Sequence, residues 1–126
     1  MNKKFYYCNH CGNFVEVLNS SGAKMVCCGS EMTLVEPGII EASVEKHIPV
    51  VSVSGDKVTI EVGSVTHPMI PNHFIQWIYL ETDNGCHRKH LTPDELPVAT
   101  FILYDEKPIA AYEYCNIHGL WKKEID

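Results

Sequence analysis

The chain has 126 residues, with 10 Lys or Arg, 16 Asp or Glu, 7 His and 6 Cys, so its formal net charge is −6. Its composition of 45% apolar and 21% charged residues excludes wholesale disorder, and the acidic balance argues against general nucleic-acid binding. No apolar run approaches the roughly 18 residues of a membrane span, and the start shows no signal peptide. We therefore expect a cytoplasmic protein, in which clustered Cys and His indicate metal binding before disulfides.

The first part of the chain predicts a small unit of short strands. Residues 14–18 and 24–28 are typical of strands, joined as a hairpin by a polar, glycine-containing turn. A second turn signal, Glu36-Pro37-Gly38, predicts a boundary that separates residues 1–36 from residues 37–126. A unit below about 40 residues usually needs a metal, disulfides or oligomerisation to fold, and we expect a homodimer on that ground.

The second part predicts an antiparallel sandwich. Val58, Ile60 and Val62 alternate with polar residues, which is the period of a half-buried strand. Prolines and glycines separate this run from similar runs, and no helical period is sustained. Strands are predicted over residues 50–53, 58–62, 73–82, 86–91, 98–105 and 109–115. The fold class is therefore all-β, with a small metal module followed by an immunoglobulin-like β-sandwich.

Four early cysteines predict a first metal centre. Cys8 and Cys11 form a Cys-x-x-Cys pair, and Cys27 and Cys28 follow as an adjacent pair. Four thiolates arranged as a tetrahedron suit zinc or iron, and the spacing does not choose between them. A disulfide framework is the third alternative. If the adjacent Cys27 and Cys28 bind the same metal ion, we expect the sulfur–metal–sulfur angle between them to be distorted.

A second metal centre is predicted in the rear part, where the chain is rich in histidine. His67 and His73 flank a loop that two prolines keep from being helical, and Cys115 and His118 form a Cys-x-x-His pair directly after a strand. With His47, these loops can meet at one end of a sandwich. Four imidazoles with an axial thiolate make a square pyramid, whose open face implies chemistry and suits a redox-active iron.

Four Cys and His residues remain without an assigned role. His87 and His90 are interpreted as surface or hydrogen-bonded side chains, and His10 is left unassigned. Cys86 is predicted to be a small buried apolar residue rather than a ligand.

These motifs resemble those of desulfoferrodoxin, the two-iron class of superoxide reductase. The Cys8 to Cys28 pattern resembles the desulforedoxin-type, rubredoxin-like iron module. The rear part matches in three ordered segments along the chain. They are Glu45-Lys46-His47-Ile48-Pro49, then His67-Pro68-Met69 with His73 and Trp77, then Cys115-Asn116-Ile117-His118-Gly119 with Trp121.

The resemblance implies two irons per chain and assigns roles to the residues of the second centre. His47, His67, His73 and His118 would be equatorial iron ligands and Cys115 the axial ligand. Glu45 resembles the carboxylate that closes the sixth position in the oxidised state, and Lys46 the cation that attracts the anionic substrate. The implied reaction is reduction of superoxide to hydrogen peroxide with a rubredoxin-like electron donor. A mononuclear iron oxygenase and a zinc-stapled, non-enzymatic binding module are the alternatives.

Overall fold

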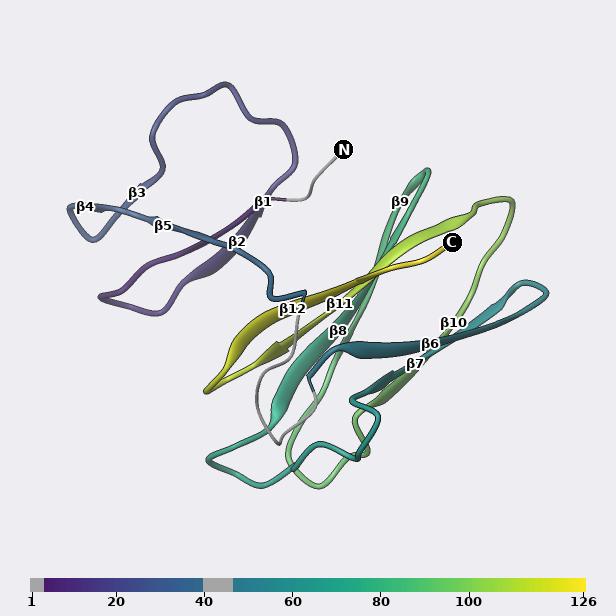
Figure 1. Ribbon diagram of the computed structural model, residues 1–126. Helices are drawn as coiled ribbons and strands as arrows, with labels where there is room; N and C mark the ends of the chain where they lie inside the picture. Colours follow the sequence, from purple (N-terminus) through teal and green to yellow (C-terminus); the bar gives the residue numbers. More distant parts are fainter. Residues whose placement is uncertain (1–3, 40–46) are drawn as a thin grey trace. The chain divides into compact units, whose positions relative to one another are not determined.

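The computed structural model describes residues 4–39 and 47–126, and these residues form strands, turns and loops (Figure 1). Among them there is no helix that is long and apolar enough to cross a membrane. The predicted all-β class is confirmed. The chain divides into two compact units, Met1–Glu36 (the first unit) and Pro37–Asp126 (the second unit).

The first unit contains a three-stranded sheet and a short hairpin. Strands β1 (Lys4–Tyr7), β2 (Phe14–Val17) and β5 (Thr33–Val35) form an antiparallel sheet in the order β2-β1-β5, and β3 (Val26–Cys27) pairs with β4 (Ser30–Glu31).

The predicted hairpin between residues 14–18 and 24–28 is wrong, because β2 pairs with β1 instead. Phe5 of β1 is buried, and its ring centroid lies 5.8 Å from that of Phe14 of β2. Aromatic cross-strand contacts of this kind stabilise a strand pair. The strand predicted to pair with β2 is β3, which is only two residues long and therefore offers few such contacts.

The second unit is a sandwich of two antiparallel sheets (Figure 1). One sheet has the order β10-β7-β6 and the other the order β12-β11-β8-β9. Their strands are β6 (Pro49–Ser54), β7 (Lys57–Val62), β8 (Ile75–Thr82), β9 (Gly85–His90), β10 (Val98–Ile102), β11 (Pro108–Cys115) and β12 (Gly119–Glu124). The predicted sandwich is confirmed, but β12 is not among the predicted strands, because the charged residues at its end hide its strand character.

The core lies between these two sheets. Val58, Ile60 and Val62 of β7 are fully buried, as their alternation predicted, and they face Ile78 and Leu80 of β8 across the sandwich. Burial of a large aliphatic side chain contributes about 1.5–3 kcal/mol, so this layer is a main source of the stability of the second unit.

An irregularity in the pairing of β8 with β11 lies at the end of this core. Tyr114 pairs with Trp77, but the next residue, Cys115, pairs with Ile75, so Gln76 is an extra residue in β8. Side chains alternate across a sheet, and an extra residue shifts that alternation. The bulge therefore lets apolar Ile75, rather than Gln76, join the core beside Cys115.

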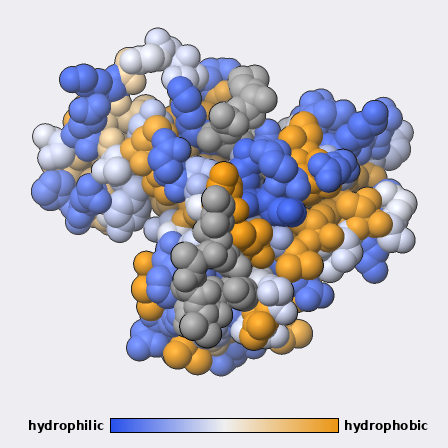
Figure 2. Space-filling model, in the orientation of Figure 1, coloured by the Kyte–Doolittle hydropathy of each residue, from blue (hydrophilic) through white to orange (hydrophobic). Residues whose placement is uncertain are grey.

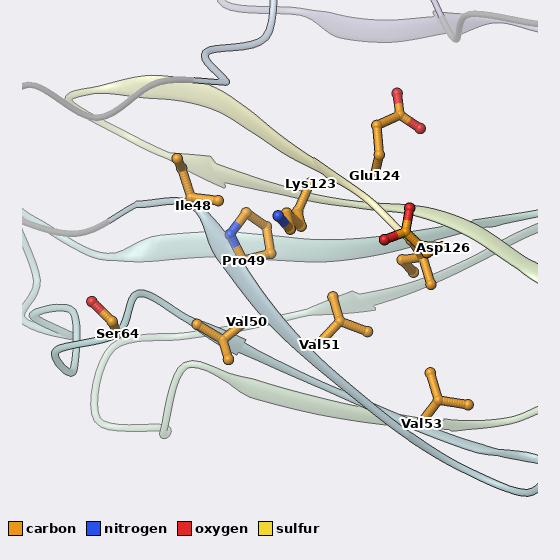
Figure 3. A pocket seen from close by; sticks show the side chains of 10 residues that line it. Ile48, Pro49, Val50, Val51, Val53, Ser64, Lys123, Glu124 and Asp126 are labelled. Atoms are coloured by element: carbon orange, nitrogen blue, oxygen red, sulfur yellow. The ribbon is translucent and has the colours of Figure 1, made fainter.

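Apolar side chains also reach the surface. On the face shown in Figure 2, hydrophobic residues are interspersed with hydrophilic ones. Val50 and Val53 of β6, an edge strand, are 43% and 52% exposed. They line a groove of about 620 Å³ between β6 and residues 123–126 (Figure 3). None of the Cys and His residues predicted to bind metal lines this groove.

Truncation of Ile60 tests the position of the core. Ile60→Ala should lower the free energy of unfolding by about 2–5 kcal/mol, because it leaves a cavity in a fully buried layer. Ile102→Ala, in the same sheet but 63% exposed, is the matched control and should change it by less than about 1 kcal/mol. Urea titration measures both values, and equal losses would place the core elsewhere.

Candidate metal centres

The second centre lies where strand ends of both sheets meet. Because neighbouring strands are antiparallel, the start of one lies beside the end of the next: Pro49 pairs with Val62, Ile75 with Cys115, and Cys115 with Gly119. The five candidate ligands lie at or between these ends. They are His47 before β6, His67 and His73 between β7 and β8, Cys115 at the end of β11, and His118 in the turn to β12.

The four imidazoles form a closed ring. One nitrogen or sulfur atom from each of the five residues lies within 4.8 Å of all the others, and His47 Nε2 lies 3.1 Å from His118 Nδ1. Cys115 Sγ lies 3.8 Å from the same His118 nitrogen. The ring centroids are 4.8 Å apart for His47–His67, His67–His73 and His47–His118, and 5.2 Å apart for His73–His118.

These distances fit a metal ion with a square base of imidazoles. With metal–nitrogen bonds of about 2.1 Å, neighbouring corners lie about 3.0 Å apart and opposite corners about 4.2 Å apart. The 3.1 Å separation of the His47 and His118 nitrogens matches a neighbouring pair. An imidazole set with a single sulfur suits a first-row transition metal. The structure thus brings together all five predicted ligands.

Two neighbouring groups fix the orientation of the imidazoles. His67 Nδ1 donates to the Pro68 carbonyl oxygen over 2.8 Å, which leaves Nε2 as the nitrogen with a lone pair for a metal. The indole of Trp121 is stacked on His47, with centroids 4.9 Å apart and planes 15° apart. The same indole donates from Nε1 to the His118 carbonyl oxygen over 3.1 Å. Trp121 thus holds two candidate ligands, a role that its sequence motif did not reveal.

The five residues of the second centre differ in exposure. His47, His67 and Cys115 are buried, His73 is half-buried and His118 is exposed. The Cys115 sulfur, at the end of a core strand, lies on the buried side. His118 is therefore the most exposed member of the ring.

The first centre is formed by the four cysteines of the first unit, whose sulfur atoms lie within 4.8 Å of one another. Cys27 Sγ lies 3.6 Å from Cys11 Sγ and 4.0 Å from Cys28 Sγ. A tetrahedron with metal–sulfur bonds of about 2.3 Å has edges of about 3.8 Å, so the arrangement fits one tetrahedral ion. Cys28 has a φ of 53°, and this left-handed backbone lets adjacent cysteines direct their sulfurs to one point.

The electrostatics of the four sulfurs also favour a cation. The backbone N–H of Cys11, followed by that of His10, lowers the pKa of Cys8 to about 6. The pKa values of Cys27 and Cys28 shift in the other direction, chiefly through the side-chain hydrogen bond of each with Cys11, and that of Cys28 reaches about 12. When one of these crowded thiols has lost its proton, its negative charge makes deprotonation of the others less favourable. A bound metal ion offsets this repulsion and favours the thiolate form.

The remaining residues belong to neither cluster: His10 lies between Cys8 and Cys11 in sequence, Cys86, His87 and His90 lie on β9, and two residues lie outside the described part of the chain. Glu45 and Lys46 are outside the described residues. The prediction for Cys86 is wrong: it is exposed, because β9 is an edge strand whose side chains mostly face solvent. His87 Nε2 lies 3.1 Å from Glu106 Oε1 and His10 Nε2 lies 3.3 Å from Ser30 Oγ, whereas His90 is exposed.

Two family models match the chain, one in the first unit and one in the second. The family model described as Desulfoferrodoxin matches residues 39–124, and the model described as Desulfoferrodoxin, N-terminal domain, matches residues 2–35. The chain is 45% identical to a desulfoferrodoxin of Syntrophotalea carbinolica over 119 residues, which cover 94% of each chain.

Solved structures extend the likeness to three dimensions. The crystal structure of the superoxide reductase from Treponema pallidum covers 98% of this chain and 98% of its own, with 36% identity and a TM-score of 0.84. The one-iron superoxide reductase from Giardia intestinalis covers 65% of this chain and 98% of its own, with 32% identity and a TM-score of 0.57. With both family models matched in order and a curated relative aligned almost end to end, the chain belongs to the desulfoferrodoxin family.

Proposed function

We propose that this chain is a superoxide reductase, which reduces superoxide by one electron to hydrogen peroxide and thereby serves defence against oxidative stress. The observation that carries the proposal is the ring of four imidazoles with one cysteine sulfur at the end of the sandwich. The two solved relatives bear this activity in their names, and one of them is described as a one-iron enzyme.

Iron is the metal we propose for both centres. Bound at the second centre, it would supply the single electron that superoxide gains. Our proposal makes His47, His67, His73 and His118 the square base and Cys115 the axial ligand, in a pyramid whose remaining face is open. Because Cys115 is buried and His118 exposed, the open face would lie on the accessible side. The imidazoles are neutral ligands, so a divalent ion with one thiolate keeps a net positive charge there.

Two residues outside the described part of the chain complete the proposed catalytic apparatus. Lys46, directly before His47 in sequence, would attract superoxide and hold a water molecule for proton delivery. Glu45 would close the open face after turnover, since an anion binds the oxidised ion better than the reduced one. The chain carries a net charge of −6, so the attraction of an anion has to be local.

The first centre has a different proposed part. Four sulfurs complete a tetrahedron and leave no position for substrate, so its iron would transfer electrons or stabilise the first unit. We therefore assign residues 1–36 as a desulforedoxin-like iron module and residues 37–126 as the catalytic domain. A rubredoxin-like protein as electron donor, a homodimer and a cytoplasmic location complete the proposal.

The two alternatives receive less support. Mononuclear iron oxygenases typically bind iron through two histidines and one carboxylate, whereas the donors that converge within the described residues are four histidines and one cysteine. A zinc-stapled binding module would need only the first centre. It does not explain why four histidines and one cysteine converge in the second unit.

Metal content and peroxide yield test the reaction. The purified chain should contain two irons, and with excess reductant it should form one hydrogen peroxide for each superoxide consumed. Dismutation would form half as much, which makes the ratio decisive. Zinc as the sole metal, or a yield of one half, would contradict the proposal.

Removal of the Lys46 charge tests the local attraction. Lys46→Ala should lower the second-order rate constant for superoxide about tenfold at low salt and weaken its dependence on ionic strength. Lys57→Ala is the control, since Lys57 pairs with Ser54 at the far end of β6 from His47. Pulse radiolysis measures both rate constants, and equal effects of the two variants would assign the attraction to overall charge.

Loss of one sulfur ligand tests the role of the first centre. Cys28→Ser should remove the first iron and unfold the first unit locally, because few of the described residues of that unit are apolar and buried: Phe5, Cys8 and Met32. The second iron and the peroxide yield should remain. Hydrogen exchange of residues 1–36 and iron analysis measure these effects, with Cys86→Ser as the matched control. Retention of two irons by Cys28→Ser would refute the proposed ligand set.

A further inference from the structure

Asn116 lies between two proposed ligands and makes three hydrogen bonds to the chain around a third. Its side-chain Oδ1 accepts from the Phe74 N–H over 2.9 Å, and its Nδ2 donates to the Asn72 carbonyl oxygen over 3.1 Å. Its backbone N–H donates to the Phe74 carbonyl oxygen over 3.2 Å. Because an amide N–H only donates and a carbonyl only accepts, these partners fix which way the Asn116 amide points.

The three bonds straddle His73. Asn72 precedes it and Phe74 follows it, so the peptide groups on both sides are held by one residue. His73 itself exchanges two backbone hydrogen bonds of 3.0 Å with Ile70, which close the loop on itself. The bonds to Ile70 shape the loop, whereas the bonds to Asn116 tie that loop to the strand end that carries Cys115.

The end of β11 at Cys115 accounts for a bond from a side chain at this position. At the bulge Cys115 pairs with Ile75, and beyond it the chain of β11 turns away toward β12. The Phe74 N–H, which a regular ladder would bind to a backbone carbonyl, therefore binds the Asn116 amide oxygen. Asparagine is suited to this position because its amide presents the same donor and acceptor groups as a peptide bond.

We propose that Asn116 is a positioning residue, which holds His73 in register with Cys115 and His118 so that the second centre binds iron in one geometry. The inference rests on the proposed function for the identity of the metal and its reaction. Asn116 would act through His73 rather than on the substrate. Residues that orient metal ligands typically contribute 10–100-fold to metal affinity, which sets the expected size of the effect.

Asn116→Ala and Asn72→Ala form a matched pair for the test. Asn72 contributes its backbone carbonyl, and its own side chain is exposed, so Asn72→Ala leaves all three bonds in place. We expect Asn116→Ala to bind iron at the second centre about 10–100-fold more weakly in a chelator competition. We also expect faster hydrogen exchange in the peptide that contains Phe74 and a heterogeneous electron paramagnetic resonance signal from the oxidised iron. Asn72→Ala should match the parent chain in all three measurements.

Asn116→Asp keeps the test valid if the alanine variant does not fold. Aspartate has nearly the same shape and accepts from the Phe74 N–H, but it cannot donate to the Asn72 carbonyl. Its negative charge would attract a cation, so weaker iron binding in this variant reports lost geometry rather than lost charge. Iron affinity and resonance signal equal to those of Asn72→Ala, in whichever Asn116 variant folds, would overturn the inference.

The outcome is separable from that of the proposed function. The peroxide yield of the parent chain decides the reaction, whereas the two variants compare metal affinity and line shape at one site. If the parent chain forms no peroxide but the Asn116 variants still lose metal selectively, the reaction is refuted and the positioning role stands.

Discussion

Five donor atoms that must come within 4.8 Å of one another constrain the architecture of the second unit. They are carried by three separate segments of chain, which the fold has to bring to one point. An antiparallel sandwich does so because strand starts and strand ends alternate at each end of a sheet. His47 thus comes to lie beside Cys115 although 67 residues separate them in sequence. The rigid core below the loops then fixes the strand ends from which the ligands project.

The two centres differ in the physical means that form them. The first centre uses a left-handed residue, Cys28, and backbone N–H groups that lower the pKa of Cys8, so it is made of short local turns. The second centre uses long-range packing: Trp121 stacks on His47 and binds the turn of His118. A saturated tetrahedron of four sulfurs, with Cys11 and Cys28 exposed, suits exchange of electrons, whereas a half-buried ring of imidazoles suits a small substrate.

The sequence was sufficient for those features that depend on residue type and local period. Alternation predicted β7, the Cys-x-x-Cys and Cys-x-x-His spacings predicted four members of the two clusters, and the adjacent cysteines and the histidines of the rear part predicted the others. It was insufficient where a feature depends on pairing. Cys86 is exposed because β9 lies at a sheet edge, which composition does not reveal. The pairing of β2 with β1 brings Phe5 into contact with Phe14, and the bonds of Asn116 depend on where β11 ends beside Phe74.

That bulge shows how an irregularity serves a metal site. In a regular ladder Gln76 would lie opposite Cys115 and would place a polar side chain in the core beside it. The extra residue brings Ile75 to that position, and Phe74, directly before β8, then lies beside Asn116 and bonds to its side chain and backbone. One backbone shift therefore keeps the buried side of the centre apolar and ties the loop of His73 to the strand of Cys115. A low-dielectric surrounding strengthens the attraction between a thiolate and a cation, so the same irregularity would also strengthen the interaction of the Cys115 sulfur with the proposed iron.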